Sequence, residues 1–392
     1  MKTAPLAPVL EEEKLDAARV RAFGDAAAPA SGTRHALVAT AAGTKPDAAA
    51  AELVRFAKES LSDDGTLLVF VPGTPADAEL AGWRNAAWPL LHAVAVYRLS
   101  QAAGVTKSTL QGTTKLRRGT GVHGAVLVLR SRAAVMAPDA TVAKFDQNAA
   151  GWNGEPGRPG YAHFRWMRRF VADFAQKRDA RRVLDFGSGA GWVGIEAALA
   201  SGGAHLSAFD PSPQMMKLVE ENARSVGLKD VAVATGFGED PPFPRAGEAP
   251  YDLVLSSGVI SFAPDSERWV DGLVRTVARG GTLVIGDIHR DSRGMRERRA
   301  TRPLLPVREM NAQTREEVRS LLEPRGFTFE AWCGYQLTGA VPRLMHVDAT
   351  RLRGALGGAI LWWNRRATAR DVARGGTDPD AFDSWVMRLV RR

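Results

Sequence analysis

The sequence predicts an α/β protein with a mostly parallel sheet, preceded by a smaller α/β domain at the N-terminus. Two observations carry this prediction. Short apolar runs alternate with helical patterns over most of the chain, an order in which helices connect neighbouring parallel strands. In addition, a glycine-rich turn, VLDFGSGAGWVG (183–194), joins a buried strand directly to a helix near the middle of the chain.

The composition is that of an ordinary globular protein without fibrous or disordered bias. The single cysteine, Cys333, excludes an intramolecular disulfide and favours a reducing compartment. The start, MKTAPLAPVLEEEK, lacks the apolar segment of a signal peptide, and no apolar run reaches the ~20 residues of a membrane span. We therefore expect a cytoplasmic protein with no membrane span and no metal. The net charge of +9 comes mainly from arginine, so it carries little weight by itself.

The first region follows an Ala-rich lead-in at 1–34. Apolar runs predict strands, and longer amphipathic or apolar stretches predict helices between them. The expected strands are 35–40, 65–71 and 123–131, and the expected helices are 47–61 and 76–97.

The second region repeats this order, with a strand at 251–257, a helix at 266–278 and a strand at 281–287. His35 and Tyr251 stand 216 positions apart, as do Gly65 and Gly281. GAVLVLRSRA (124–133) is also similar to GAILWWNRRA (358–367). These similarities indicate an internal repeat; the alternative is that any two buried α/β segments look this similar.

The glycine loop satisfies the G-x-G-x-x-G pattern through Gly189, Gly191 and Gly194, which is a weak signal for a dinucleotide site. Asp210, at the end of the next strand, suits a ribose-binding acid. Asp185 stands at the strand end before the glycines, where a negative charge would repel a pyrophosphate. It would instead favour a cationic ligand.

With these motifs the sequence resembles the class I S-adenosylmethionine-dependent methyltransferases, in the small-molecule branch with ubiquinone-biosynthesis-like motifs, over about residues 145–366. The resemblance implies a Rossmann-like fold with a mostly parallel seven-stranded sheet, and S-adenosyl-L-methionine as the cofactor. The motifs that carry it are LDFGSGAG, FDPSPQMMKLVEENA (209–223), GFGEDPPF (236–243), YDLVLSSGVISFAPD (251–265) and ARGGTLVIGD (278–287).

The resemblance also implies a division of the chain. We expect a methyltransferase-like half-domain that lacks the cofactor loop, then a catalytic domain, then a helical extension in which 378–392 forms an amphipathic terminal helix. The half-domain could serve a structural, dimerising or acceptor-shaping role through 87–97, so a homodimer is one expectation. The boundaries expected for the lead-in and these three parts are 1–34, 35–135, 140–366 and 367–392.

The resemblance implies a set of cofactor-binding residues. Asp210 would accept hydrogen bonds from the ribose hydroxyls. Phe237 stands where the family usually has an acid for the adenine amino group, so we expect adenine to be held by the backbone of Phe237 and Gly238 or by Glu239. The full expected set is Asp185, Gly187, Ser188, Gly189, Gly191, Asp210, Pro211, Phe237, Gly238, Glu239 and Ser256.

The acceptor side is expected beyond the fifth strand of this domain. His289 is the candidate general base, with Asp287, Trp152 and Tyr161 near the acceptor. The stretch HRDSRGMRERRATR (289–302), with Arg296 and Arg298, predicts a basic lip that would attract an anionic or lipid-like acceptor; the alternative is a solvated arginine-rich loop.

We therefore expect a methyltransferase acting on a small molecule. The alternatives are a methyltransferase acting on RNA or protein, a non-enzymatic binding protein, and a dinucleotide-dependent oxidoreductase. LSSGV follows the fourth strand in place of the Asn/Asp-Pro-Pro-Tyr/Phe motif of base methylation, which makes a nucleic-acid acceptor the weaker alternative.

Overall fold

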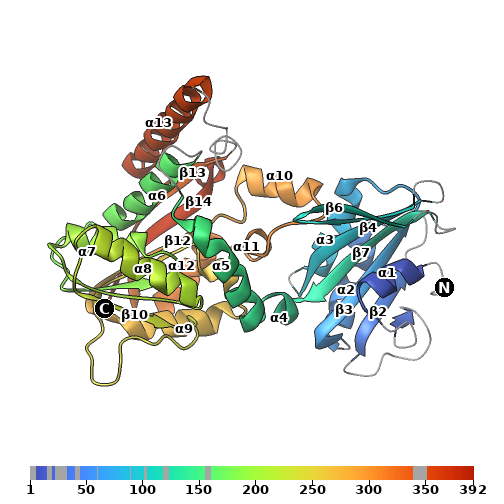
Figure 1. Ribbon diagram of the computed structural model, residues 1–392, viewed down its shortest axis with the longest axis horizontal. Coiled ribbons are helices and arrows are strands. Elements are labelled where there is room, and N and C mark those ends of the chain that lie inside the picture. The colour runs from blue at the N-terminus through green and yellow to red at the C-terminus, as the bar shows by residue number, and fades with distance from the viewer. Residues whose placement is uncertain are drawn as a thin grey trace. The chain divides into compact units, whose positions relative to one another are not determined.

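The chain forms two compact units, each built on one seven-stranded sheet (Figure 1). The first unit comprises Met1–Ala137 and Arg296–Asn311, and the second comprises Pro138–Met295 and Ala312–Arg392. The structure is a computed structural model that describes residues 6–15, 20–22, 33–39, 45–59, 61–88, 90–100, 104–117, 123–154, 160–338 and 351–392.

In the first unit, the sheet has buried side chains on both faces. Alternate residues of a strand point to opposite faces, and in β3 (Leu61–Pro72) Leu67 and Val69 join one core while Leu68 and Phe70 join the other. Helices α2 (Pro46–Glu59) and α3 (Asp77–Ala87) pack on the first of these faces, and α1 (Ala7–Glu12) packs on the second. The strand order is β1-β2-β3-β7-β4-β5-β6. The other strands are β1 (Val20–Ala22), β2 (Thr33–Ala39), β4 (Leu91–Ser100), β5 (Gly104–Thr109), β6 (Gly112–Arg117) and β7 (Gly124–Ser131).

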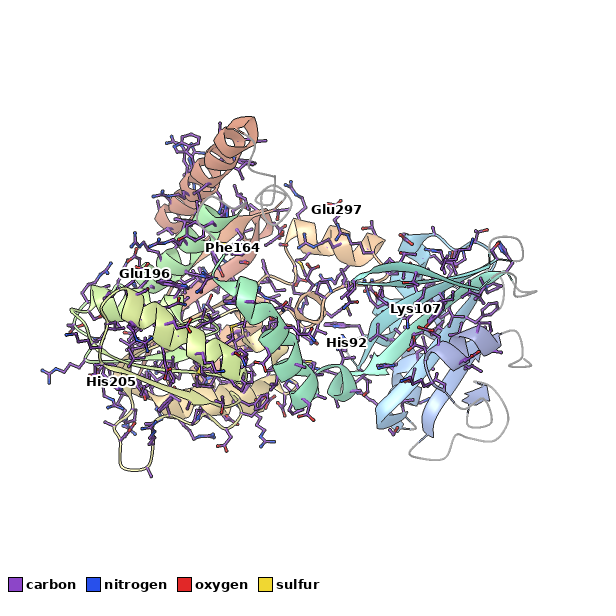
Figure 2. The ribbon with its side chains drawn as sticks, in the orientation of Figure 1. His92, Lys107, Phe164, Glu196, His205 and Glu297 are labelled. Atoms are coloured by element: carbon purple, nitrogen blue, oxygen red, sulfur yellow. The ribbon has the colours of Figure 1, made fainter. Side chains whose placement is uncertain are left out.

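The predicted helix at 76–97 is wrong beyond residue 87. Trp88 has an extended backbone, with ψ 145°, as expected for a residue that precedes a proline in the sequence. The apolar run that follows is strand β4, which is paired on both sides, by β5 and by β7. Residues 91–97 therefore lie inside the sheet and do not offer the helical contact surface that the sequence suggested. His92 of this strand is buried, and burial lowers its pKa to about 4 (Figure 2).

The expectation of a mostly parallel sheet is also wrong for the first unit. Strands β1, β2 and β3 are parallel, but β7 runs antiparallel to both β3 and β4. A further antiparallel pair, β5 and β6, extends the edge. These two strands were not predicted, because they are largely polar and no apolar run in the sequence marks them.

The second unit has a Rossmann-like sheet of order β10-β9-β8-β11-β12-β14-β13, in which only β14 runs antiparallel to its neighbours. Its strands are β8 (Arg182–Phe186), β9 (His205–Asp210), β10 (Val231–Thr235), β11 (Tyr251–Ser257), β12 (Val277–Ile288), β13 (Phe327–Leu337) and β14 (Phe382–Arg391). Its helices are α5 (Pro138–Trp152), α6 (Tyr161–Phe174), α7 (Trp192–Ala200), α8 (Pro213–Ser225), α9 (Ser266–Thr276), α12 (Arg315–Leu322) and α13 (Arg351–Ala373). The shorter helices among the described residues are α4 (Arg132–Val135) and α11 (Val307–Met310) in the first unit, the 3₁₀ helices Ile260–Phe262, Glu323–Arg325 and Pro379–Ala381 in the second, and α10 (Arg293–Thr301), whose residues are divided between the units.

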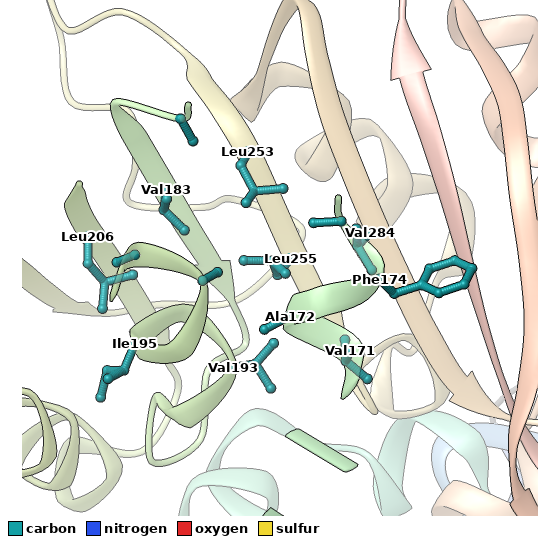
Figure 3. Packing of buried hydrophobic residues seen from close by; sticks show 14 of the residues in the cluster. Val171, Ala172, Phe174, Val183, Val193, Ile195, Leu206, Leu253, Leu255 and Val284 are labelled. Atoms are coloured by element: carbon teal, nitrogen blue, oxygen red, sulfur yellow. The ribbon is translucent and has the colours of Figure 1, made fainter. Parts of the chain in front are cut away.

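Helices cover both faces of this second sheet. Figure 3 shows α6 and α7 packed on one face, with Val171 and Val193 against Leu253, Leu255 and Val284 of the central strands. Helices α9 and α12 fill the opposite face around the fully buried Trp269. Exposed charges lie outside these cores; Glu196 of α7, for example, pairs with Arg169 of α6 at 3.2 Å (Figure 2).

The predicted terminal helix at 378–392 is a strand, β14, and the predicted helical extension at 367–392 is wrong from there on. Helix α13 ends at Ala373, and β14 is inserted between β12 and β13. Val386 contributes to one core and Trp385 and Met387 contribute to the other. An apolar run that is buried on both faces of a sheet does not alternate cleanly, which is why a helix pattern could be fitted to it.

The two units share the connectivity of four strands. In the second unit the chain passes from β11 through β12 to β13 and returns as β14 between β12 and β13. In the first unit it passes from β2 through β3 to β4 and returns as β7 between β3 and β4. Thr66 is the first residue of β3 that pairs with β7, and Thr282 is the first residue of β12 that pairs with β14; the two are 216 positions apart. The counterpart of β7 is therefore β14, and the alignment with 358–367 is wrong because those residues lie in α13.

The segment Arg296–Asn311 follows the last methyltransferase-like motif in the sequence, but it belongs to the first unit. Fully buried Arg84 of α3 donates hydrogen bonds to the carbonyl oxygens of Arg299, at 2.6 Å, and Arg302. These carbonyls lie at the end of α10, where a cation is favourable. The Trp88 indole donates to the Met310 carbonyl at 2.7 Å. The inserted segment is thus held by buried donors.

Replacing Trp385 tests the position of β14. We expect Trp385→Ala to lower the free energy of unfolding by about 3–5 kcal/mol, because it removes a large fully buried side chain. Denaturant unfolding followed by circular dichroism measures this. Val226→Ala is the matched control, since Val226 is exposed in the same unit and should change stability by less than about 0.5 kcal/mol. Equal stability of the two variants would mean that the tail is dispensable.

Replacing Arg84 tests the anchoring of the inserted segment. We expect Arg84→Met to cost about 1–3 kcal/mol, because the Arg302 carbonyl loses its donor while the Arg299 carbonyl keeps the Asn85 amide at 3.1 Å. Arg98→Met is the matched control: it removes a half-exposed ion pair with Asp77, worth about 0–1 kcal/mol, and a hydrogen bond to the Pro75 carbonyl at 3.2 Å. Denaturant unfolding of both variants gives the comparison, and an Arg84 variant as stable as the Arg98 variant would contradict the anchoring role.

Candidate functional site

The glycine loop connects the end of β8 to the start of α7 at the carboxyl edge of the second sheet. Gly187 and Gly189 have φ of 72° and 51°, in the left-handed region that favours glycine. A Cβ on Gly187 would lie 2.6 Å from the Val259 side chain, and one on Gly189 would lie 2.9 Å from the Trp152 indole nitrogen. The protein's own packing therefore already demands glycine at both positions.

Asp210, at the end of β9, holds this loop. Its carboxylate accepts hydrogen bonds from the Gly189 and Ser212 backbone N–H groups, both at 3.0 Å. Burial raises the Asp210 pKa to about 6, although these two hydrogen bonds oppose the shift. One acid thus connects the strand end, the loop and the start of α8.

Asp185 lies at the end of β8 and is almost fully buried. It accepts a hydrogen bond from the Gly194 N–H in the first turn of α7 at 2.8 Å. Burial, with a smaller contribution from the nearby Asp210 carboxylate, raises its pKa to about 7, although the Gly194 hydrogen bond opposes the shift. Two buried acids beside one loop disfavour each other's charge, so a positively charged ligand placed near them would be stabilised.

Helix α5 covers the loop and is anchored in its second half and just beyond its C-terminal end. Asp146 accepts hydrogen bonds from the Ser212 hydroxyl and the Gln214 N–H at the start of α8. Just beyond the helix, Asn153 exchanges hydrogen bonds with buried Asn222 of α8 at 2.8 and 3.0 Å. Arg168 of α6 donates to the Trp152 carbonyl at 2.9 Å. Trp152 is predicted from the sequence, but these anchors are not, because single Asp, Asn and Arg residues form no recognisable motif.

An aromatic cluster stands on this covering helix. The Phe145 ring packs edge-on against Trp152 at 5.9 Å and against Phe262 at 5.2 Å, between ring centroids. The Lys144 ammonium lies 4.7 Å from the Phe262 centroid. Phe262 follows β11, so the cluster joins the covering helix to the carboxyl edge of the sheet. Phe145 and Phe262 are candidate acceptor-side residues that sequence reasoning missed.

The loop after β10 brings Phe237, Gly238 and Glu239 to the same edge of the sheet. The Phe237 side chain is 36% exposed, so it can still cover a ligand. Gly238 is closely packed: a Cβ there would lie 2.2 Å from the Trp269 indole nitrogen. One carboxyl oxygen of Glu239 is buried without a hydrogen-bond partner, and burial raises the Glu239 pKa.

The other expected cofactor residues make contacts within the protein. The Ser188 N–H donates to the Phe209 carbonyl at 2.8 Å, and the Ser256 hydroxyl donates to the Phe186 carbonyl at 3.0 Å. Gly191 begins α7 in a left-handed conformation. Pro211 is half-buried between Asp210 and Ser212.

Of the expected acceptor-side residues, Tyr161 begins α6 and accepts a hydrogen bond from Arg165 at 3.3 Å. Asp287 is fully buried at the end of β12, where its carboxylate accepts bonds from the Ser261 N–H and hydroxyl at 3.0 Å. It therefore joins β12 to the turn after β11. His289 is buried, its Nδ1 lacks a hydrogen-bond partner, and burial lowers its pKa, which keeps the imidazole neutral.

The expected basic lip is divided between the two units. Arg290 remains in the second unit and pairs with Glu317 at 2.7 Å. Arg296 and Arg298 belong to the first unit, and Arg298 pairs with Glu309 at 3.1 Å. Arg293 is exposed in the second unit, but the other arginines of this stretch make ion pairs or lie on the anchored segment, which favours the alternative to the lip.

The His, Cys, Asp and Glu side chains of the described residues form no group of three that could hold a metal ion. No helix in this part of the chain has the length and apolar character needed to cross a membrane.

The buried Asp185 predicts a pH dependence. A carboxyl whose folded pKa lies above its unfolded value stabilises the protein below the unfolded pKa, and this contribution is lost as pH rises through about 7. We expect Asp185→Asn, which keeps an acceptor for Gly194, to gain stability relative to the parent over that range. Urea unfolding at several pH values measures the difference. Glu220→Gln, which changes an exposed carboxyl on α8, serves as control, and a difference that stays constant with pH would contradict the raised pKa.

Comparisons with known proteins agree with this geometry. A family model described as a methyltransferase domain matches residues 161–331. An uncharacterized protein of Mycobacterium tuberculosis is 39% identical over 106 residues, which are 27% of this chain and 36% of that protein. The ubiquinone biosynthesis O-methyltransferase of Xylella fastidiosa is 30% identical over 125 residues, 30% of this chain and 47% of that enzyme. The matches thus span between a third and a half of the length of these relatives.

A solved structure of phosphoethanolamine N-methyltransferase 2 from Haemonchus contortus, in complex with S-adenosyl-L-methionine, aligns with 92% of this chain and 85% of its own, at 15% identity and a TM-score of 0.42. The family match covers the glycine loop, Asp185, Asp210 and the loop after β10. Residues 161–331 therefore match a methyltransferase domain, which supports S-adenosylmethionine as the cofactor.

Proposed function

We propose that this protein transfers a methyl group from S-adenosylmethionine to a small-molecule acceptor. The observation that carries the proposal is the pair of buried carboxyls, Asp185 and Asp210, beside a glycine loop at the carboxyl edge of the sheet. Among the described residues, no cationic side chain lies close enough to lower the pKa of either carboxyl. A cationic ligand would supply the missing positive charge.

Named residues fit the parts of that cofactor. Asp210 has acceptor capacity beyond its two backbone bonds and would bind the ribose hydroxyls. Asp185 would favour the cationic end. Glu239, with its unpartnered buried oxygen, would accept a hydrogen bond from the adenine amino group, and Phe237 would cover the ring. This assigns the adenine contact to Glu239 at a loop where the family's usual acid is replaced by Phe237.

The residues around Trp152 support a small, partly apolar acceptor. Trp152, Phe145 and Phe262 provide an aromatic surface, and Lys144 adds a positive charge suited to an anionic group on the acceptor. An RNA or protein acceptor has less support, because all the arginines of 289–302 except the exposed Arg293 make ion pairs or belong to the anchored segment.

When bound, S-adenosylmethionine supplies an electrophilic methyl group on a sulfonium. Transfer is an in-line displacement in which an acceptor lone pair forms the new bond to carbon as the carbon–sulfur bond breaks. The protein's part is to align the reactants and exclude water, which the anchored α5 and its aromatic cluster would do. A hydroxyl acceptor must also lose a proton, and neutral His289 is the candidate to take it.

We further propose that the first unit is a repeat of the second half of a methyltransferase domain with a structural role. It shares the β11-β12-β14-β13 connectivity, and its short β1 pairs in parallel with β2 as β8 pairs with β11, but its sequence has no counterpart of the glycine-rich turn at 187–191. It therefore has no means of its own to hold the cofactor. Anchoring the segment Arg296–Asn311, which connects β12 to α12, is a role that its buried Arg84 supports.

Titration calorimetry with S-adenosylmethionine tests the proposed function. We expect Asp210→Ala to weaken binding by about 10–150-fold, because hydrogen bonds to a charged group contribute about 1.5–3 kcal/mol. Asp230→Asn is the matched control: it replaces an exposed aspartate beside the opposite end of β9 and should bind like the parent. Parent-like binding by Asp210→Ala would refute the assignment of this site.

A further inference from the structure

Helix α13 presents an unusual outer face on the second unit. It lies beside β13, the edge strand of the sheet, and its inward side packs through Ile360, which is buried against Leu337 and Phe382 (Figure 1). Buried Asn364 on the same side donates a hydrogen bond to the Tyr335 carbonyl and accepts one from the Leu337 N–H. Buried Asp371 accepts a hydrogen bond from the Gly334 N–H. The inward face is therefore fixed by specific contacts with the sheet.

The outward face carries large apolar side chains. Trp362 and Trp363 are 62% and 51% exposed, the highest values among the large apolar residues exposed in the second unit. Leu356 and Val372 are exposed on the same helix, at 48% and 40%. Four large apolar residues exposed on one helix mark an interaction surface.

The charges on this helix have one sign. The exposed charged residues at 355–374 are Arg365, Arg366, Arg370 and Arg374. The acid of this stretch, Asp371, is buried against β13. None of the four arginines pairs with a carboxylate among the described residues; the Arg366 guanidinium lies instead 5.6 Å from the centre of the Trp362 ring. A partner for this face should therefore be anionic and should accept apolar groups.

We propose that α13 docks this protein on the surface of an anionic lipid bilayer. Tryptophan is enriched where membranes meet water, because its ring is apolar while its N–H can still be hydrated. Arginines beside it would lie at the level of the lipid phosphates, and each basic residue near such a surface adds to the attraction. In this arrangement the helix lies in the plane of the membrane surface, with its tryptophans in the interface.

The same charges argue against a second copy of this helix as the partner. Trp362 and Arg366 are one turn apart on the outward face, so two copies related by a two-fold axis would bring like charges together. A nucleic acid would match the arginines, but it offers no apolar layer for Leu356 and Val372. The proposal does not rest on the proposed function, because the docking face lies on residues separate from the glycine loop and its acids.

Vesicle co-sedimentation of the full chain tests the proposal. We expect binding to vesicles of phosphatidylcholine mixed with phosphatidylglycerol, weaker binding as salt is raised, and little binding to phosphatidylcholine alone. The double change Trp362→Ala/Trp363→Ala should weaken binding by about tenfold or more. Arg365→Gln/Arg366→Gln should weaken it by about fivefold per arginine removed.

Two controls match these variants. Arg224→Gln/Arg279→Gln removes two exposed arginines elsewhere in the second unit, and Leu199→Ala removes an exposed apolar residue of α7. Both should bind vesicles like the parent. Because all the changed side chains are exposed, each variant should also keep the parent's circular dichroism spectrum and affinity for S-adenosylmethionine, which separates loss of docking from loss of fold.

Three outcomes would overturn the proposal. The first is equal binding to anionic vesicles by the tryptophan variant and the parent. The second is a dimer, seen by analytical ultracentrifugation, that the tryptophan variant dissociates while vesicles are not bound. The third is binding to a single-stranded RNA oligonucleotide that both α13 variants lose while vesicles are not bound.

Discussion

The Asp210 carboxylate is the contact on which the rest of the candidate site depends. By accepting the Gly189 and Ser212 N–H groups it fixes the glycine loop to the end of β9 and to the start of α8. Ser212 in turn donates to Asp146, which sets the position of α5 and therefore of Trp152 over the loop. The covering helix, the loop and the sheet edge are thus linked through one buried acid. The acid is costly to ionise without a cation.

This arrangement explains why the loop could be recognised while its cover could not. The glycines, Asp185 and Asp210 stand at fixed spacings, because a strand, a turn and a helix place them, so the sequence predicts them directly. The anchors of α5 are paired with residues far along the chain, such as Asn153 with Asn222. Pairing at that distance follows from the three-dimensional packing. The glycines also proved to be required by Val259 and Trp152 before any ligand is considered.

The errors in fold prediction have related causes. Strand β14 and strand β4 are both apolar runs buried on two faces, a pattern that periodicity cannot distinguish from a buried helix. In one case a proline after Trp88 was the local signal that should have ended the helix. Residues 124–133 and 358–367 are similar in sequence, but the connectivity of the two sheets makes β14 the counterpart of β7. Strand order therefore supports the repeat more firmly than the aligned residues did.

The course of the chain also constrains how the protein can be made. The first unit is interrupted after Ala137 and is completed only by Arg296–Asn311, so a ribosome must synthesise five of the seven strands of the second sheet, β8 to β12, before the partners of Arg84 exist. Domains usually fold in order as they emerge, but here a guanidinium destined for full burial must wait for the carbonyls of Arg299 and Arg302. Neither unit corresponds to a continuous stretch of the gene. A recombination event that exchanged one unit would therefore need at least two breakpoints, which ties the inheritance of the two sheets together.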